Sequence, residues 1–169
     1  MDQDDEQFLI HPERIDAKPQ VLRGTFAPAD LERLEGAIAG EAGELRYEIT
    51  AQLDRQRRKT LSCIIEGFVF LICQNTLEAF RQEISIRDRL VLVDDESGLP
   101  SVEEESEDED YVVADEPLDV RDLVEDAVLL SLPMIPRKPG TEGAARPEAP
   151  QGPKPSPFAA LASLKKSKR

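Results

Sequence analysis

Apolar and polar residues alternate along three consecutive stretches in the first half of the chain. The pattern is clearest over residues 44–54, and it continues over residues 60–73 and 80–93. Because successive side chains of a strand point to opposite faces of its sheet, this period predicts three antiparallel strands in a meander. The middle stretch is apolar on both faces from Phe68 to Ile72, so we expect this central strand to be covered on both sides.

Two shorter strands and a helix are expected before the meander. Residues 8–10 and 21–26 are short apolar stretches of strand length. Residues 28–40 predict an amphipathic helix, because a proline suits its first turn and its apolar side chains lie one helical turn apart. These side chains are Leu31, Leu34 and Ile38, and Gly40 is typical of a helix end.

A second helix is expected after the meander, over residues 119–132. Asp119 has the side chain of a helix cap, and Pro133 ends the pattern. Its apolar face is expected to contain Val120, Leu123, Val124, Ala127 and Leu130. Together these elements predict an α+β fold in which two helices cover an antiparallel β-meander.

Acidic residues are concentrated in one insertion. The net charge is −14, yet residues 94–126 alone hold 16 acidic residues against one arginine. Carboxylates that repel one another and have little to bury predict a disordered acidic loop over residues 94–118. This loop lies inside a single predicted domain of residues 5–136. It either keeps the protein soluble or shields a basic partner by charge complementarity.

The C-terminal part of the chain has the composition of a linker followed by a basic helix. Eight of the 13 prolines lie between residues 133 and 157. Residues 137–155 are therefore expected to form a flexible Pro-rich linker. Residues 156–169 are expected to form a short helix with lysines in its last turn.

The sequence favours a soluble protein of a reducing compartment. No apolar stretch approaches the ~18 residues that cross a bilayer, and the acidic start is unlike a signal peptide. Cys63 and Cys73 are expected on one strand, ~30 Å apart and beyond disulfide reach. We therefore expect two free thiols, a cytoplasmic location and no membrane partner.

Few residues have the character of an active site. The chain contains one histidine, His11, and its two cysteines are expected in apolar strand interiors where nothing electropositive lowers a thiol pKa. The carboxylates of the acidic insertion lack the fixed geometry that acid–base catalysis needs, and no phosphate-binding loop begins a helix. We therefore expect no enzyme, no cofactor, no metal and no small-molecule substrate.

Two groups of basic residues are candidate contacts for an RNA backbone. They occupy the turn after residue 54 and the C-terminal tail, and they are Arg55, Arg57, Arg58, Lys59, Lys166, Lys168 and Arg169. Alternatively, the turn is charged for solubility and the tail lysines favour a helix C-terminus. Neither group has interleaved aromatic residues, so any RNA contact is expected at the backbone and sensitive to salt.

The C-terminal helix is also a candidate protein-binding motif. A helix this short is marginal alone in water, so we expect it to enter a groove on a partner or to dock on its own sheet. The candidate partner-binding residues are Pro157, Phe158, Leu161, Leu164 and Lys165, with Glu125 and Asp126 of the preceding helix.

Several short motifs follow one another from end to end of the chain. They are Pro12-x-Arg14, Gly24-x-Phe26-x-Pro28, Cys73-Gln74, Asp122-Leu123-Val124-Glu125-Asp126, Leu132-Pro133, and Pro157-Phe158-Ala159-x-Leu161-x-x-Leu164-Lys165. In their order and spacing they resemble the motifs of the bacterial YceD family, the large ribosomal RNA subunit accumulation proteins, and the last motif is the most distinctive.

The resemblance implies a non-enzymatic role in the synthesis, processing or stability of 23S ribosomal RNA. The implied partner is a ribosomal RNA precursor or a large-subunit ribosomal protein. Many family members continue the central strand as Cys-x-x-Cys-Gly, which resembles half of a metal site. This chain has Thr76 and Leu77 at the last two of those positions, so a zinc ion is not expected here.

Three functions are therefore compared. The first is a factor for 23S ribosomal RNA accumulation in large-subunit biogenesis. The second is an acidic protein-binding module or chaperone for a basic ribosomal protein, without RNA contact of its own. The third, a metal-dependent RNA-processing enzyme, requires a cluster of pre-organised carboxylates or histidines that the sequence lacks.

Overall fold

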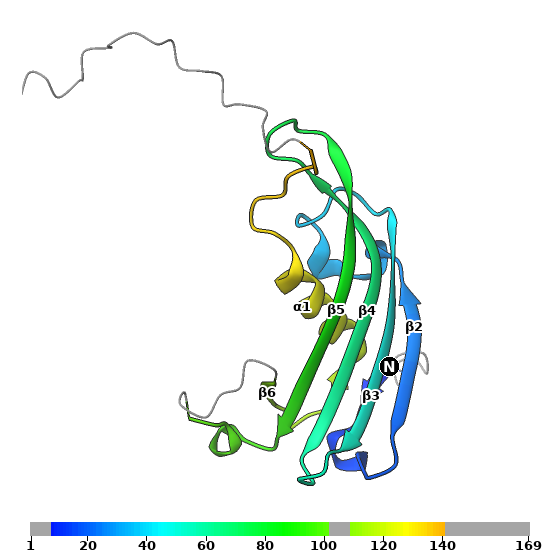
Figure 1. Cartoon of the computed structure of the whole chain (residues 1–169). Coiled ribbons are helices and arrows are strands. Elements are labelled where there is room, and N and C mark those ends of the chain that lie inside the picture. Colours follow the sequence, from blue (N-terminus) through cyan, green and yellow to red (C-terminus); the bar gives the residue numbers. More distant parts are fainter. Residues whose placement is uncertain (1–7, 102–108, 141–169) are drawn as a thin grey trace, which may run out of the picture. The chain divides into compact units, whose positions relative to one another are not determined.

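The structure, a computed structural model, describes residues 8–101 and 109–140. The chain separates into two units, residues 1–138 and 139–169, and all described helices and strands belong to the first. Five of the described strands form one sheet in the order β2-β3-β4-β5-β6, and α1 (Val120–Ser131) lies against one of its faces (Figure 1). The strands are β2 (Gln20–Phe26), β3 (Gly43–Leu53), β4 (Lys59–Ile72), β5 (Ala79–Val93) and β6 (Asp110–Val113).

The predicted α+β class and the meander are confirmed. Strands β2 to β5 pair antiparallel in sequence order, and each long strand lies within one residue of its predicted bounds. Residue 63 of the central strand β4 faces Ile49 of β3 on one side and Asp88 of β5 on the other. The period-2 pattern therefore predicted these strands, and their observed register keeps the apolar rows of neighbouring strands on one face of the sheet.

The core lies between the sheet and α1. Every second side chain of β3 and β4 is buried there, including Leu45, Ile49, Leu61, Ile65 and Leu71, which are at most 1% exposed. Both cysteines belong to this buried row and are free thiols, as expected.

The helix predicted over residues 28–40 is wrong. Two 3₁₀ turns, Pro28–Asp30 and Glu32–Leu34, occupy its place, separated by Leu31 in a non-helical conformation. The main chain then takes positive φ at Gly36 and Gly40, which ends any regular helix. The apolar pattern itself was meaningful, because Leu31 and Leu34 are fully buried beneath the turns. The described residues thus contain one α-helix where two were predicted.

Helix α1 confirms the second predicted helix, but its apolar face differs from the prediction. Asp119 caps it, since its Oδ1 accepts a hydrogen bond from the N–H of Arg121 at 2.7 Å. The fully buried side chains are Val120, Val124 and Val128, four residues apart. Leu130, predicted on this face, is 87% exposed, because it lies about 200° around the helix from Val128.

The prediction of a disordered insertion over residues 94–118 is wrong for several of the described residues. Strand β6 pairs in parallel with the end of β5, Tyr111 facing Val91. β7 (Leu118–Asp119) pairs with β1 (Leu9–Ile10) in a separate two-stranded sheet. Two further 3₁₀ turns lie at Pro12–Arg14 and Glu96–Gly98. The predicted linker and C-terminal helix lie, from residue 141 onward, outside the described residues.

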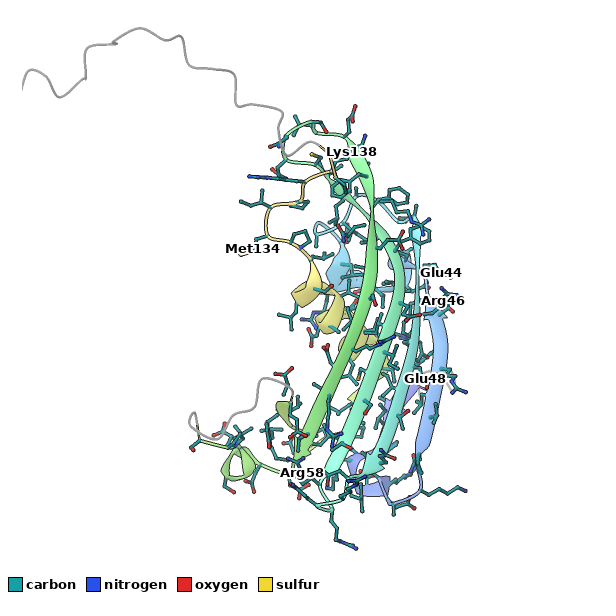
Figure 2. The ribbon with its side chains drawn as sticks, in the orientation of Figure 1. Glu44, Arg46, Glu48, Arg58, Met134 and Lys138 are labelled. Carbon is teal, nitrogen blue, oxygen red and sulfur yellow. The ribbon has the colours of Figure 1, made fainter. Side chains whose placement is uncertain are left out.

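The prediction that the central strand β4 is covered on both sides is wrong. One face packs on the core, but no described helix lies over the other, which we call the open face. It carries Phe68, Phe70 and Ile72: the two phenylalanines are half-buried and Ile72 is 41% exposed. Figure 2 shows Glu44, Arg46 and Glu48 on the side of the sheet away from α1. Phe68 lies directly opposite Glu44 in the β3–β4 register and therefore on the same face.

Candidate partner-binding surfaces

The turn between β3 and β4 carries the first group of predicted RNA contacts. Arg55 and Arg57 are exposed at its tip, and Arg57 has a positive φ of 63°. Lys59 is half-buried and its Nζ lies 2.6 Å from Asp94 Oδ1. Arg58 is also half-buried and turned toward its own domain. Of the four predicted basic contacts, the structure thus presents two to solvent and engages the other two in ion pairs.

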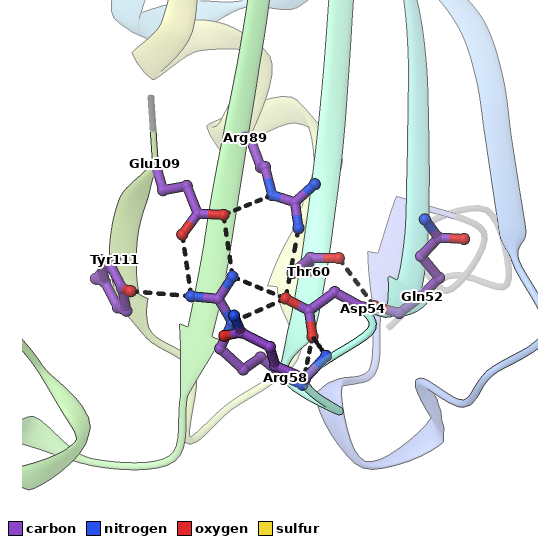
Figure 3. A network of polar contacts seen from close by, with 8 residues as sticks. Gln52, Asp54, Arg58, Thr60, Arg89, Glu109 and Tyr111 are labelled. Carbon is purple, nitrogen blue, oxygen red and sulfur yellow. Dashed lines mark hydrogen bonds and ion pairs between the residues drawn. The ribbon is translucent and has the colours of Figure 1, made fainter. Parts of the chain in front are cut away.

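Arg58 is the centre of a polar network that joins the turn to the segment before β6 (Figure 3). Its guanidinium donates to both carboxylate oxygens of Glu109 at 3.0 Å, to Asp54 Oδ2 at 2.8 Å and to the Tyr111 hydroxyl at 3.1 Å. Arg89 adds contacts to Asp54 and Glu109. The network therefore holds the segment before β6 against the turn, and it engages Arg58 in ion pairs within its own domain.

The network shifts the pKa of its members in the direction that strengthens it. Burial would raise the pKa of Asp54, but hydrogen bonds donated by Arg58 and Gln56 outweigh burial and lower it. The hydrogen bonds from Arg58 likewise lower the pKa of Glu109. The pKa of Arg58 itself is raised, because both carboxylates favour its charged form.

The two predicted partner-binding residues of α1 differ in accessibility. Glu125 is only 4% exposed, and its Oε1 accepts a hydrogen bond from the N–H of Arg33 at 3.0 Å. Asp126 is exposed and its Oδ1 lies 2.6 Å from Arg33 Nη2. Glu125 thus connects α1 to the 3₁₀ turn Glu32–Leu34 by a hydrogen bond, whereas Asp126 lies on the surface. The other predicted contacts, in the C-terminal motif and tail, lie outside the described residues.

Cys73 lies in a different chemical environment from the apolar interior that was expected. Its Sγ accepts a hydrogen bond from the N–H of Lys138 at 3.3 Å. This contact, together with donors from Thr76 and Asn75, lowers the pKa of the thiol to about 6. The expectation that nothing lowers a thiol pKa here is therefore wrong for Cys73. Burial raises the pKa of Cys63 to about 12, so that cysteine fits the expectation.

Within residues 8–101 and 109–140, no group of three or more His, Cys, Asp or Glu side chains is placed to hold a metal ion. Thr76, which stands at the second cysteine position of the family pattern, contributes a hydrogen bond to Cys73. A threonine hydroxyl does not replace a cysteine thiolate as a zinc ligand, so Thr76 does not supply the second ligand of a zinc site.

One group of residues that the sequence pattern does not identify as a surface lies on the open face of the sheet. Arg81 lies over the ring of Phe68, with its guanidinium carbon 3.7 Å from the ring centroid, and Phe70 contacts Phe68 edge-on at 6.0 Å between centroids. The signal was present, because Phe68 and Phe70 alternate with the core residues of β4. The pattern predicts a second covered face, whereas the structure leaves these two rings half-buried with no described helix over them.

The fold is thus an α+β domain whose candidate surfaces are a charged turn, an acidic helix and an aromatic open face. The protein-family comparison matches residues 61–165 to "Large ribosomal RNA subunit accumulation protein YceD". Since the match covers more than half of the chain, the chain belongs to the YceD family. Comparison with curated proteins and with solved structures gave no match. Among the described helices, none is long and apolar enough to span a membrane.

Proposed function

We propose that this protein is a non-enzymatic factor for the synthesis, processing or stability of 23S ribosomal RNA, acting in the cytoplasm during bacterial large-subunit biogenesis. The observation that carries this proposal is the family match over residues 61–165. It extends across β4, β5 and α1 into the C-terminal segment where the candidate motif lies.

The proposed partner is a ribosomal RNA precursor. Arg55 and Arg57 remain exposed at the β3–β4 turn, so they keep the role of candidate backbone contacts. Arg58 and Lys59 are secondary candidates: Arg58 is engaged by Asp54 and Glu109, and Lys59 is half-buried and pairs with the exposed Asp94. The C-terminal lysines and arginine, with the apolar motif around Phe158, remain the principal proposed contacts of the tail.

A non-enzymatic mode of action agrees with the chemistry of the described acidic groups. Asp54 and Glu109 accept hydrogen bonds from Arg58 that lower their pKa, which makes each a weaker proton acceptor. Glu125 is buried and accepts a hydrogen bond from a main-chain N–H. The proposal therefore assigns binding, and no bond-breaking step, to the protein.

The test is affinity purification of the tagged full chain from growing cells, with and without ribonuclease. Large-subunit RNA should co-purify, and its recovery should fall in an Arg55→Glu, Arg57→Glu variant and on deletion of residues 154–169. The matched control is Arg137→Glu, Lys138→Glu, which changes the net charge equally at two exposed positions at the opposite end of the sheet from the turn (Figure 2).

Two results would argue against the proposal. Recovery of a basic ribosomal protein that persists after ribonuclease, with RNA recovery unaffected by the charge changes, would favour a protein-binding chaperone. Recovery of neither ribosomal RNA nor ribosomal proteins would contradict a role in subunit biogenesis altogether.

A further inference from the structure

The open face of the sheet carries a small aromatic cluster at one end of its central strand. Phe68 and Phe70 lie two residues apart on β4, with their rings in an edge-to-face arrangement. Arg81 of β5 faces Phe70 in the strand register, and its guanidinium carbon lies over the neighbouring Phe68 ring, 3.7 Å from the centroid. Guanidinium groups and aromatic rings are both groups on which further planar groups stack.

Phe68 and Arg81 of this cluster line a shallow depression of about 460 Å³ on the same face. Its lining also includes Gly67, Arg46, Glu66 and Glu83. Gly67 adds no side chain to the depression. The site therefore combines a planar apolar surface with hydrogen-bond donors and acceptors around it.

The charged residues of the open face form ion pairs of balanced sign, and their arginines are largely exposed. Four arginines pair with four glutamates: Arg23 with Glu48, Arg46 with Glu44, Arg81 with Glu83, and Arg87 with Glu66. Each of these arginine side chains is more than half exposed. Exposed ion pairs contribute little to stability, so their members can exchange partners with a ligand. In a chain of net charge −14, this face is locally neutral.

We propose that the open face binds unpaired nucleobases of single-stranded RNA, with one base stacked on Arg81 and Phe68. This inference rests on the proposed function, and it names the chemistry of the RNA contact within the described domain. Aromatic residues on a sheet surface and arginine planes are the groups on which proteins stack splayed-out bases.

Both the arginines and the glutamates of the open face have complementary groups in single-stranded RNA. Its phosphates accept hydrogen bonds from guanidinium groups such as that of Arg46. The exocyclic amino groups of guanine, cytosine and adenine donate to carboxylates such as those of Glu66 and Glu83. A basic groove for the backbone alone would not contain these glutamates, so we assign base contacts to this face. The backbone contacts, which depend on salt, belong to the turn and the tail.

The test is fluorescence anisotropy of the full chain with labelled single-stranded oligoribonucleotides of about 12 nucleotides. Phe68→Leu removes the aromatic ring but keeps an apolar side chain, and it should weaken binding about tenfold. Phe68→Trp keeps a stacking surface and should bind at least as well as the wild type. Arg81→Gln should weaken binding in the same direction as Phe68→Leu.

The chain offers a matched control in a second phenylalanine–arginine pair. Phe8 lies under Arg121, 4.6 Å from guanidinium carbon to ring centroid, and Phe8 packs against the core side of the sheet. Phe8→Leu should leave RNA affinity unchanged. The affinity ratio between wild type and Phe68→Leu should also stay constant as salt is raised, because stacking is not an ionic contact. Thermal melts of each variant establish that the fold is intact.

Equal RNA affinity of folded Phe68→Leu and wild-type protein would overturn the inference. It would also be overturned if Phe68→Leu left RNA binding intact and lost a co-purifying ribosomal protein, since the face would then bind protein. Both results leave the proposed function standing, provided that ribosomal RNA is still recovered from cells. Conversely, if no ribosomal RNA is recovered from cells with the wild-type protein, the proposed function is contradicted, whatever affinity the oligonucleotides show.

Discussion

Arg58 and Glu109 are 51 residues apart in the sequence, yet the guanidinium of one donates two hydrogen bonds of 3.0 Å to the carboxylate of the other. The pair attaches the segment before β6 to the β3–β4 turn. A planar, two-point contact of this kind fixes orientation as well as distance. The acidic segment is thereby held to the sheet at the place where β6 begins.

Replacement of Arg58 by alanine should destabilise the domain. It leaves Asp54 and Glu109, whose side chains are 9% and 19% exposed, without their main donor. We expect a loss of about 1–2 kcal/mol in the free energy of unfolding, below the value for a fully buried pair because Arg58 is partly exposed. Urea unfolding measures this loss, and Arg58→Lys should recover only part of it.

The control for this prediction is Arg55→Ala, at an exposed position of the same turn. It should change the free energy of unfolding by no more than about 0.5 kcal/mol. If both alanine variants unfold at the same urea concentration, the network contributes nothing and Arg58 is available for RNA after all.

Glu125 is expected to act on stability and not directly on a partner. Glu125→Ala leaves the N–H of Arg33 without its acceptor inside the interface between α1 and the 3₁₀ turn, which should cost about 1–3 kcal/mol. Glu125→Gln keeps a carbonyl oxygen and should lose less. Asp126→Ala, at the exposed neighbouring position, should cost at most about 1 kcal/mol. Denaturant unfolding of the three variants gives these differences, and an Asp126→Ala loss exceeding that of Glu125→Ala would contradict the assignment.

Gly67 is required by a close contact between β3 and β4. A Cβ at this position would lie 1.9 Å from the carbonyl oxygen of Glu44, and the main-chain φ of +156° is one that side-chain-bearing residues rarely adopt. Gly67→Ala should therefore cost at least about 3 kcal/mol of stability. Gly36→Ala is the control, because its Cβ would meet nothing within 4 Å and only its φ of +82° costs energy, about 1–2 kcal/mol. Similar melting temperatures of the two variants would show that the strands separate easily at Gly67.

Local periodicity was sufficient to predict the long strands but not the elements that depend on distant partners. The alternation over residues 44–54 required β3 whatever lay around it. Strand β6 was missed because Tyr111 and the two valines after it follow an acidic run whose composition favours disorder, and only their pairing with β5 makes a strand. A parallel partner 20 residues away leaves no local pattern.

The candidate sites show the same limit. Arg58 was predicted as an RNA contact because its neighbours are basic, and nothing local indicates that Glu109 binds it. The aromatic pair on β4 was visible in the sequence, but whether a second layer covers it is a property of the whole fold. The low pKa of Cys73 comes in part from Lys138, which is 65 residues away and lies beyond the end of α1.

The Cys73 thiol should make the stability of the domain depend on pH. Its pKa is about 6 in the folded protein against 9.0 for the unperturbed group, so between these values the unfolded chain binds the proton more readily. The thiolate contribution is therefore fully present above pH 9 and is lost as pH falls through 6. The difference in unfolding free energy between wild type and Cys73→Ala should rise from pH 6 to pH 9, measured by urea unfolding at several pH values. Cys63→Ala is the control: the folded Cys63 pKa is about 12 and the unperturbed value is 9.0, so up to about pH 8 the thiol keeps its proton in both states and the difference should stay constant. Toward pH 9 it should fall slightly, opposite in sign to Cys73, because only the unfolded thiol begins to ionise. A difference for Cys73→Ala that is equally flat would mean that the sulfur is a neutral thiol, and that the N–H of Lys138 adds no more than an ordinary weak hydrogen bond.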